Sequence, residues 1–484
     1  MEYDLSTVEV PPPEKMTEEG VEAIHDVSIQ IMEDIGIKVA HEEARDILAE
    51  AGATVDEENE IVRIPESLVD DALEKPPSSF TLHSRNPDRN TGVGDGDTTL
   101  TSTYGAPNVL RYGEGRRAST IADYEDLAKI AQMEEVIGCT GYNLCEPTDV
   151  PQEVKHYEMV PRSLKLTDKP VMGSTYGEER ARASLEMVGI ANDDRDLSKP
   201  YMTGIINTVS PRTWDTRMTG GLLEYAKAGQ PVLISPAVMA NASGPSTLAG
   251  SFALANAEIL TGVVLSQQIN PGTPIVYGLP SSNVDVRYGS FSIGSPEGGL
   301  FVSFAAQMAR SYDIPVRAGG TLNDSKTIDD QSGAESMFQL MIAMFSDIDF
   351  MLHAAGILNS YSTVSPEKYV LDCERIRYVQ RFQRGYDLND ETFAVDLLEE
   401  VEPGGHFLNK RHTLEHSKTD HYMTKIFNRQ SYDDWESKGS KDAFAAAHDR
   451  VNELLDTYER PPLDEDIEQE LDEYVERGKE EALN

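Results

Sequence analysis

The chain has 484 residues, of which 42 are lysine or arginine and 84 are aspartate or glutamate, so its formal net charge is −42. The acidic residues are spread along the whole chain, which indicates a solvated acidic surface suited to a salt-rich cytosol and excludes the basic stripe of a nucleic-acid-binding protein. The three cysteines have neither the number nor the spacing of a disulfide framework or a zinc site. The amino terminus is acidic, whereas a signal peptide would be basic. No apolar run is expected to approach the ~20 residues of a membrane span. Together these features predict a cytoplasmic protein outside the membrane.

Residues 1–97 are predicted to form an N-terminal accessory region of mixed α and β structure. Apolar residues recur at helical spacing over residues 17–35. A second helix is expected over residues 41–51, and a short strand follows at residues 61–64. The glycines of residues 91–98 follow no strand and lack the spacing of a dinucleotide-binding fingerprint, so this segment is interpreted as a turn.

Residues 98–360 alternate between short apolar strand candidates and helical patterns. The expected strands are centred near Leu100, Ile137, Val171, Met202, Val232, Ile275, Val316 and Phe350. This repeat predicts an α/β fold, a TIM (β/α)8 barrel, with a doubly wound open sheet as the alternative. Residues 361–484 change to charged helices, which predicts a C-terminal, mostly helical extension that wraps the barrel.

The predicted barrel brings the carboxyl ends of its strands to one mouth, where parallel α/β folds carry their chemistry. The polar and aromatic side chains that follow the strands there are Tyr104, Asn143, Glu146, Tyr176, Asn207, Tyr277, Asn283, Arg317 and His353. The sequence contains neither a Gly-x-Ser-x-Gly nucleophile motif nor a phosphate-binding loop. Hydrolysis by a catalytic triad and phosphoryl transfer therefore lose support.

A mouth rich in tyrosine can hold a quaternary ammonium group, because the ring faces attract a cation that has little hydration to lose. The candidate cage residues are Tyr104, Tyr142, Tyr176, Trp214, Tyr277, Tyr288 and Phe291. For any single ring, ordinary packing in the core or at the rim is the alternative. The predicted substrate-binding residues are Tyr104, Tyr176, Tyr277, Asn143, Glu146 and Asn207.

Arg317 and His353 end two neighbouring predicted strands and are the predicted catalytic residues. The guanidinium of Arg317 can form two parallel hydrogen bonds to a substrate carboxylate, and its alternative is a structural salt bridge to Asp324 or Asp329. His353 can hydrogen-bond a ligand or move a proton, and its alternative is a buried histidine with satisfied hydrogen bonds. These two positions are the strongest candidates for chemistry in the chain.

A metal site is the other chemistry that the sequence invites. Four histidines lie close together near the C-terminus: His406, His412, His416 and His421. Neither a His-Glu-x-x-His motif nor a cysteine accompanies them, so hydrogen bonds that pin a loop are the favoured role. No bound metal is expected.

Several motifs resemble those of the trimethylamine methyltransferase (MttB-like) superfamily. In chain order they are Leu82-His83-Ser84-Arg85-Asn86-Pro87, Arg317-x-Gly319-Gly320, Asp324-Ser325-Lys326, Asp329-x-Gln331-x-Gly333-x-Glu335, Gly404-Gly405-His406-Phe407-Leu408 and His412-Thr413-Leu414-Glu415-His416. Trimethylamine-specific members carry pyrrolysine, whereas this sequence has only standard residues. The chain is therefore similar to the branch that includes glycine betaine and related quaternary amine methyltransferases.

The resemblance implies a methyltransferase that moves a methyl group from a quaternary amine to the Co(I) of a corrinoid carried by a separate protein. The ammonium makes its tertiary amine a good leaving group, so no protein nucleophile is implied. By the same resemblance, Arg317 and His353 lie near the substrate, and His353, Gly319 and Gly320 lie near the corrinoid. The implied partners are the cognate corrinoid protein and a small methylated amine, in a homo-oligomer that binds neither nucleic acid nor a membrane.

Two alternatives stay open on the sequence alone. One is a trimethylamine or other one-carbon methyltransferase with a different acceptor, such as a folate or a thiol. The other is a barrel that binds quaternary amines without catalysis. Dependence on the acceptor distinguishes the first, and ligand-induced stabilisation without methyl transfer distinguishes the second.

Overall fold

At the centre of the structure lies a parallel sheet whose strands are buried on both faces. The computed structural model describes residues 4–5 and 12–483. The strands of this sheet follow one another in the order β10, β11, β13, β15, β18, β19 and β7. Their bounds are β7 Thr99–Leu100, β10 Val171–Gly173, β11 Met202–Ile206, β13 Val232–Ile234, β15 Ile275–Gly278, β18 Val316–Gly319 and β19 Phe350–Leu352. Continuous runs of apolar and small residues suit strands that are covered on both faces.

The two edge strands of this sheet are linked by a short segment that carries Cys139 and Thr140. Thr101, just after β7, forms a parallel bridge with Cys139, and Thr140 forms another with Val171 of β10. No strand is assigned near Ile137 among the described residues, and these two isolated bridges lie where the sequence predicted one. The other predicted strands form the sheet at their expected positions.

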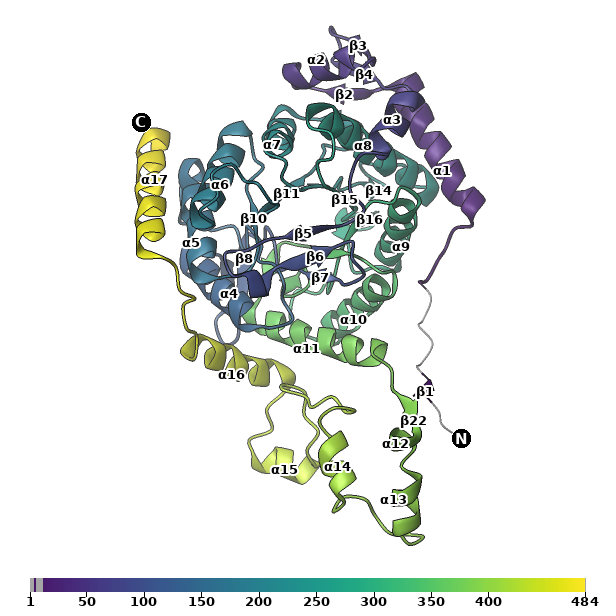
Figure 1. Cartoon of the computed structure of the whole chain (residues 1–484), viewed down its shortest axis with the longest axis vertical. Coiled ribbons are helices and arrows are strands. Elements are labelled where there is room, and N and C mark those ends of the chain that lie inside the picture. The colour runs from purple at the N-terminus through teal and green to yellow at the C-terminus, as the bar shows by residue number, and fades with distance from the viewer. Residues whose placement is uncertain (1–3, 6–11, 484) are drawn as a thin grey trace.

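Helices surround the sheet as a ring (Figure 1). They are α4 Ile121–Met133, α5 Lys155–Leu166, α6 Glu178–Ala191, α7 Thr216–Lys227, α8 Leu248–Ile269, α9 Pro296–Ser311, α10 Asp330–Phe345 and α11 Pro366–Gln383, with a short 3-10 turn Gln152–Val154 before α5. Successive helices from α4 to α8 pack on one another, as do α9, α10 and α11. Because α11 also packs on α4, the ring of helices returns to its beginning.

Helix α8 is the most apolar element of the ring. Its 22 residues have a mean hydropathy of 1.6 over the most apolar stretch, so the expectation that no run approaches the length of a membrane span is wrong. In the fold, 78% of that stretch is buried. Burial between the sheet and the outer helices accounts for its composition, since a helix apolar on all sides is a core helix.

The N-terminal accessory region covers one side of the ring. Its elements are α1 Glu18–Gln30, a π-helical turn Ile31–Ile35, β2 Ile37–Val39, α2 Glu42–Glu50, β3 Thr54–Asp56, β4 Ile61–Arg63 and α3 Glu66–Leu73. β2, β3 and β4 form one sheet with β12 (Thr213–Trp214), which lies between β11 and α7 in the chain. Helices α1, α2 and α3 contact α8, so this region is anchored on the most apolar helix.

A hairpin of β5 (Phe80–Leu82) and β6 (Thr91–Val93) lies across the amino ends of the sheet strands (Figure 1). The hydroxyl groups of Thr91 and Thr99 lie 2.7 Å apart, and the amide of His83 donates to the carbonyl of Pro200 at 2.8 Å. The segment predicted as a turn from residue 91 therefore begins as a strand. Since the hairpin covers the amino ends, the carboxyl ends form the mouth of the sheet.

Two small sheets frame this mouth. One contains β20 Ile357–Leu358, β21 Thr363–Val364, β8 Asn108–Arg111 and β9 Gly115–Ala118, and the other contains β14 Met239–Ala240, β16 Ser282–Asp285 and β17 Ser290–Ser292. Each is built from segments that leave the carboxyl ends of central strands. Both small sheets therefore lie at the carboxyl ends of the central strands, on the side of the mouth.

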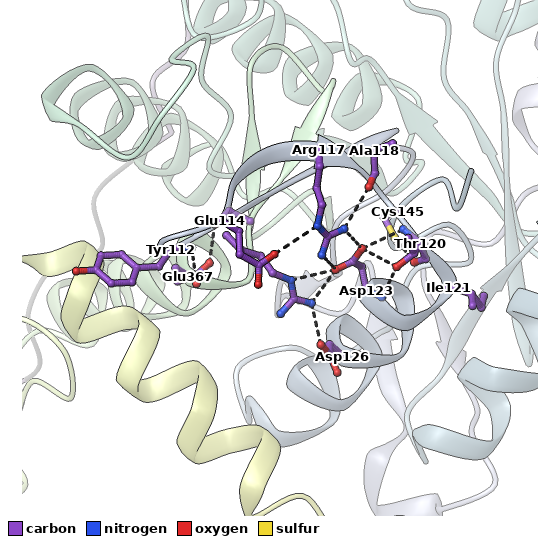
Figure 2. A network of polar contacts seen from close by, with 12 residues as sticks. Tyr112, Glu114, Arg117, Ala118, Thr120, Ile121, Asp123, Asp126, Cys145 and Glu367 are labelled. Carbon is purple, nitrogen blue, oxygen red and sulfur yellow. Dashed lines mark hydrogen bonds and ion pairs between the residues drawn. The ribbon is translucent and has the colours of Figure 1, made fainter. Parts of the chain in front are cut away.

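The β8–β9 hairpin is fixed to the start of α4 by a network around Asp123 (Figure 2). Asp123 is buried and accepts hydrogen bonds from Arg117 at 2.6 and 2.9 Å, from Arg111 at 3.0 Å and from the hydroxyl of Thr120 at 2.8 Å. Arg111 also donates to Asp126 at 2.7 Å. Burial raises the pKa of the Asp123 carboxyl, but the hydrogen bonds from Arg117 and Thr120 and the charge of Arg111 outweigh it and lower the pKa to about 2.

The C-terminal part divides into two helices that lie on the ring and an arm that leaves it. α16 Ala443–Asp456 packs on α11 and α4, and α17 Glu465–Leu483 packs on α5 and α6. The arm, residues 387–437, projects away from the ring in Figure 1. It contains β22 Leu388–Asn389, α12 Asp390–Phe393, α13 Val395–Glu400, α14 Arg411–His416 and α15 Tyr432–Ser437, and β22 pairs with β1 Asp4–Leu5. The last two helices of the C-terminal part lie on the ring, and the arm returns to α11, where Tyr422 donates to Glu374 at 2.9 Å and Arg381 donates to the carbonyl of Asp420 at 2.9 Å.

Replacing Asp123 by Asn is expected to lower the free energy of unfolding by about 2 kcal/mol at neutral pH, because a stabilised carboxylate is lost from a buried network. The pKa of this group is lowered on folding from 3.8. Its contribution is therefore complete above that value and is lost as the pH falls towards 2. Denaturant unfolding of both proteins at neutral pH and near pH 3 measures the difference, which should shrink in acid. An equal difference at both pH values would contradict this assignment.

Candidate functional site

Arg317 is the most unusual side chain at the mouth of the sheet. It is fully buried on β18, and none of its three side-chain nitrogens has a hydrogen-bond partner within the described residues. Gly278 stands opposite it in β15, where an added Cβ would lie 1.9 Å from the hydroxyl oxygen of Ser235. Burial lowers the pKa of the guanidinium to about 10, so the group is still charged at neutral pH.

The salt-bridge alternative for Arg317 does not hold. The carboxylate of Asp324 accepts hydrogen bonds from the amides of Ile293 at 3.0 Å and Gly294 at 3.1 Å. Asp329 caps α10 by accepting from the amide of Ser332 at 2.9 Å. Within residues 12–483, neither carboxylate forms a hydrogen bond or an ion pair with Arg317. A buried charge without a counter-ion is costly, so this guanidinium is available to an anionic ligand.

His353 follows β19 and lies beside Arg317. Its backbone is left-handed, with φ of 60°, and its ring packs against Tyr361 at 4.7 Å and edge-on against Tyr104 at 6.4 Å between centroids. Burial, and then the charge of Arg317, hold the pKa of the imidazole well below its usual value, so the ring is neutral. Its Nδ1 atom has no partner within the described chain, which does not fit a buried histidine with satisfied hydrogen bonds.

Tyr361 belongs to the same cluster, although sequence reasoning missed it. Its ring stacks on Phe291 at 6.2 Å, and its buried hydroxyl has no hydrogen-bond partner among the residues described. Burial raises the pKa of this phenol, and the charge of Arg317 opposes the rise. The sequence offers no periodic signal here, because Tyr361 lies in the turn between β20 and β21.

A cavity of about 320 Å³ opens beside this cluster, and Tyr104 belongs to both. It gathers five of the six predicted substrate-binding residues, namely Tyr104, Asn143, Glu146, Tyr176 and Asn207. The carboxylate of Glu146 accepts from the amide nitrogen of Asn143 at 2.5 Å and pairs with the buried Lys155. Glu146 is therefore held by its neighbours and its charge is offset.

Arginines flank Tyr176 at the rim of this cavity. The guanidinium carbon of Arg217 lies 4.5 Å from the ring centroid and that of Arg180 lies 5.3 Å away. The ring faces that would attract a quaternary ammonium already hold cations. Tyr176 thus lies at the predicted place, but its surroundings favour a negatively charged neighbour. Sequence reasoning missed both arginines, which lie near the starts of α6 and α7.

Tyr277 is the sixth predicted substrate-binding residue, and the structure separates it from the others. Its hydroxyl donates to Asn256 of α8 at 3.0 Å and its ring lies 6.3 Å from that of Tyr312. It therefore points outward to the helices, because alternate residues of a strand face opposite sides. The predicted cage residue Trp214 is buried against Gly262 of α8, also outside the mouth.

The remaining candidates lie in other surroundings. Gly319 and Gly320 are packed against protein atoms, because an added Cβ would lie 2.1 Å from Leu322 and 2.7 Å from Met351 respectively. Tyr288 is exposed at the tip of the β16–β17 hairpin, and Asn283 accepts a hydrogen bond from Ser295 at 3.0 Å.

The four C-terminal histidines lie on the arm. The rings of His412 and His416 stack at 4.2 Å between centroids. Within the residues described, no three or more histidine, cysteine or carboxylate side chains form a group able to hold a metal ion.

Comparison with known proteins places this site in a family. The family model described as trimethylamine methyltransferase (MTTB) matches residues 2–482. The chain belongs to the MTTB family. A glycine betaine methyltransferase of Desulfitobacterium hafniense is 41% identical over 96% of this chain and 97% of its own length. A proline betaine:corrinoid methyltransferase of Eubacterium limosum is 32% identical over 85% of this chain and 86% of its own.

More distant members of the family, and one solved structure, share the same extent of chain. A trimethylamine methyltransferase of Methanosarcina acetivorans is 28% identical over 96% of this chain and 94% of its own length. The crystal structure of the monomethylamine methyltransferase of Methanosarcina barkeri aligns with a TM-score of 0.54 at 11% identity, covering 93% of this chain and 89% of that one. At this identity the likeness concerns the fold.

Replacing Arg317 by Met is expected to leave the free energy of unfolding unchanged or to raise it, by up to about 4 kcal/mol, because a buried charge without a partner is removed. The matched control is Arg375→Met, since Arg375 is also buried but donates to Asp372 at 2.6 Å. The control is expected to lose about 3 kcal/mol or more. Denaturant unfolding measures both. If both variants lost stability equally, Arg317 would have a structural partner after all.

Proposed function

We propose that this MTTB-family chain transfers a methyl group from a quaternary amine that carries a carboxylate, such as glycine betaine, to the Co(I) of a corrinoid on a separate protein. The names of the relatives at 41% and 32% identity support the reaction class. The observation that carries the substrate class is the buried guanidinium of Arg317 without a counter-ion. A carboxylate is the ligand that its planar fork binds with two parallel hydrogen bonds.

The residues of the mouth fit the demands of this reaction. The corrinoid, when bound, supplies a nucleophilic cobalt that accepts the methyl group. Arg317 holds the carboxylate, and the rings of Tyr104 and Tyr361, which flank His353, offer faces to the ammonium. His353 lies where it contacts the substrate or the corrinoid, and its free Nδ1 is a fitting hydrogen-bond group for either. Gly319 and Gly320 serve the corrinoid only indirectly, through the shape of the turn.

The electron count explains why no protein acid or base is needed. The carbon–nitrogen bond breaks with both electrons left on nitrogen, and the product is a neutral tertiary amine that keeps its carboxylate. No proton has to be delivered in this step. A neutral His353 is compatible with it, and the site has to position the donor and exclude water.

We also propose how the chain divides into an accessory region, a barrel and a C-terminal extension. The sheet forms a closed TIM barrel of eight βα units in which Cys139 and Thr140 supply the eighth strand, supported by the two parallel bridges at the sheet edges. The accessory region is residues 1–97. The barrel begins at residue 98 and, because α11 packs between α10 and α4, continues past residue 360 to the end of α11. The C-terminal extension follows.

The cellular setting is proposed from charge. A net charge of −42 suits a salt-rich cytoplasm, where short screening lengths weaken self-repulsion. The partners proposed are the cognate corrinoid protein, a small methylated amine and further copies of this chain. Binding of nucleic acid is not part of this proposal, because the surface charge has the wrong sign.

The test mixes the purified protein, in high salt, with reduced cobalamin and one amine at a time: glycine betaine, proline betaine, choline or trimethylamine. Methyl transfer is expected with the betaines and is followed in the cobalt spectrum as loss of Co(I) and growth of methyl-Co(III). Arg317→Met is expected to lower kcat/KM for glycine betaine about 100-fold, since a buried charge pair to the substrate is lost.

The control variant is Arg287→Met, which removes an exposed arginine that pairs with Asp285 on the β16–β17 hairpin. It should keep wild-type activity. Transfer that requires a folate or thiol acceptor would overturn the corrinoid assignment. Activity with choline or trimethylamine that exceeds activity with both betaines would overturn the substrate class.

A further inference from the structure

We infer that Tyr361 completes the anion site of Arg317, and that this pair makes the enzyme select donors with a carboxylate over methylated amines without one. The inference rests on the proposed function and deepens it. It names Tyr361 as a specificity residue of that site. The inference stands on two observations, the unsatisfied polar groups of the cluster and the strained turn that carries Tyr361.

The first observation is that hydrogen-bonding groups gather here without partners. The hydroxyl of Tyr361, the three nitrogens of Arg317 and Nδ1 of His353 are all buried and unsatisfied within the described residues. Buried polar groups are nearly always hydrogen-bonded, because leaving such a group without a partner is costly. The rings of His353 and Tyr361 lie 4.7 Å apart between centroids, and the charge of Arg317 acts on both groups. Such a cluster is suited to a polar ligand. A carboxylate satisfies donors from both Arg317 and Tyr361.

The second observation is the strain of the turn before Tyr361. Asn359, Ser360 and Tyr361 have φ values of 52°, 50° and 72°, so three successive residues other than glycine adopt the left-handed conformation. Such residues are uncommon and strained, and they persist only where their surroundings fix them. Strain of this kind clusters at functional sites.

The surroundings fix this turn from several sides. The hydroxyl of Ser360 lies 2.6 Å from a carboxylate oxygen of Asp324 and 2.9 Å from the carbonyl oxygen of Phe291. The amide of Ser360 donates to the carbonyl of Asn323 at 3.1 Å, and the amide of Asn359 donates to Ser325 at 2.9 Å. These contacts tie the turn to the loop after β18. Tyr361 is thereby held beside His353 with its hydroxyl inside the protein.

A purely space-filling role would not explain the hydroxyl. A phenylalanine would fill the same volume and leave no unsatisfied oxygen. A site built to hydrogen-bond a polar group rejects ligands that lack it, because its own buried groups are then left unpaired. Selection between a carboxylated and an uncharged donor is the effect expected of this arrangement.

The test is isothermal titration of the purified protein, without corrinoid, with glycine betaine and with choline. Tyr361→Phe is expected to weaken glycine betaine binding at least about tenfold, as for the loss of a hydrogen bond to a charged group, and to leave choline binding unchanged. The matched control is Tyr312→Phe, since Tyr312 is a half-buried tyrosine whose hydroxyl accepts a hydrogen bond from Asn256 at 2.9 Å outside the mouth. This control is expected to bind both ligands as the wild type does.

The outcomes separate the inference from the proposed function. Equal weakening of both ligands by Tyr361→Phe would make Tyr361 a packing residue, and unchanged binding of glycine betaine would remove it from the site. In either case wild-type binding and turnover leave the proposed function standing. If the wild type binds neither ligand and transfers no methyl group, the proposed function fails and the inference fails with it.

A second inference concerns the arm, residues 387–437, and comes from its surface. We propose that the arm packs against a second copy of this chain. Large apolar side chains are exposed along it, among them Val395, Leu398, Phe407, Leu408, Leu414, Met423 and Tyr432. Leu408 is 84% exposed and Leu414 is 71% exposed. Such a concentration in one segment marks an interaction surface.

Charge and shape favour a second copy as the occupant. Residues 387–402 carry seven acidic side chains and no lysine or arginine, whereas residues 403–430 carry five lysines or arginines against two acids. A hollow of about 370 Å³ beside the arm is lined by Tyr378, Phe382 and Arg429, among others. Each arm thus carries an acidic segment and a basic segment. It also has protruding apolar side chains and lies beside a hollow lined partly by aromatic rings. A two-fold interface requires such a self-complementary patch.

Sedimentation velocity in high salt tests this proposal. The wild type is expected to sediment as an oligomer, and Leu408→Ser combined with Leu414→Ser is expected to sediment as a monomer with an unchanged melting temperature. The control combines Val286→Ser with Tyr288→Ser, two equally exposed apolar residues on the β16–β17 hairpin, and should remain oligomeric. A monomeric wild type, or an oligomer that survives the leucine substitutions, would overturn the proposal.

Discussion

The site depends on keeping a positive charge buried without giving it a counter-ion from the protein. The two carboxylates considered as salt-bridge partners of Arg317 are committed elsewhere, Asp324 to backbone amides and Asp329 to a helix cap. Behind the site, Asp372 of α11 accepts hydrogen bonds from both Lys368 at 2.5 Å and Arg375 at 2.6 Å. These two buried cations therefore have a partner in the protein, whereas Arg317 has none within the described residues.

The same buried ions also shape the loops that form the site. Lys368 donates to the carbonyl of Thr321, just after β18, at 3.0 Å, and Asp372 accepts from the amide of Gly356, just after β19, at 2.8 Å. Arg317 lies in β18, and His353 directly follows β19. A helix of the outer ring thus fixes the positions from which the polar cluster is built, and a buried network of this kind is rigid when every member is paired.

The sequence predicts the sheet well, because buried parallel strands are short apolar runs with polar ends. It predicts individual side chains less well. Tyr277 was assigned to the mouth although Gly278, one residue later, is the residue that faces Arg317 in register, and a single step along a strand reverses the side. Tyr361 was missed because its turn is strained by contacts with the distant loop after β18. A periodic pattern of apolar residues shows neither which side of a strand a given residue faces nor which distant loop a turn contacts.

The acidic composition explains why the charge has to be buried. At about 1 M salt the screening length is near 3 Å, so attractions between exposed charges are largely lost. With a net charge of −42, the surface would also repel a carboxylate at low salt. A guanidinium inside the protein escapes both effects, because buried pairs are screened much less. An interior cation such as Arg317 therefore suits the proposed recognition of a small anion at high salt.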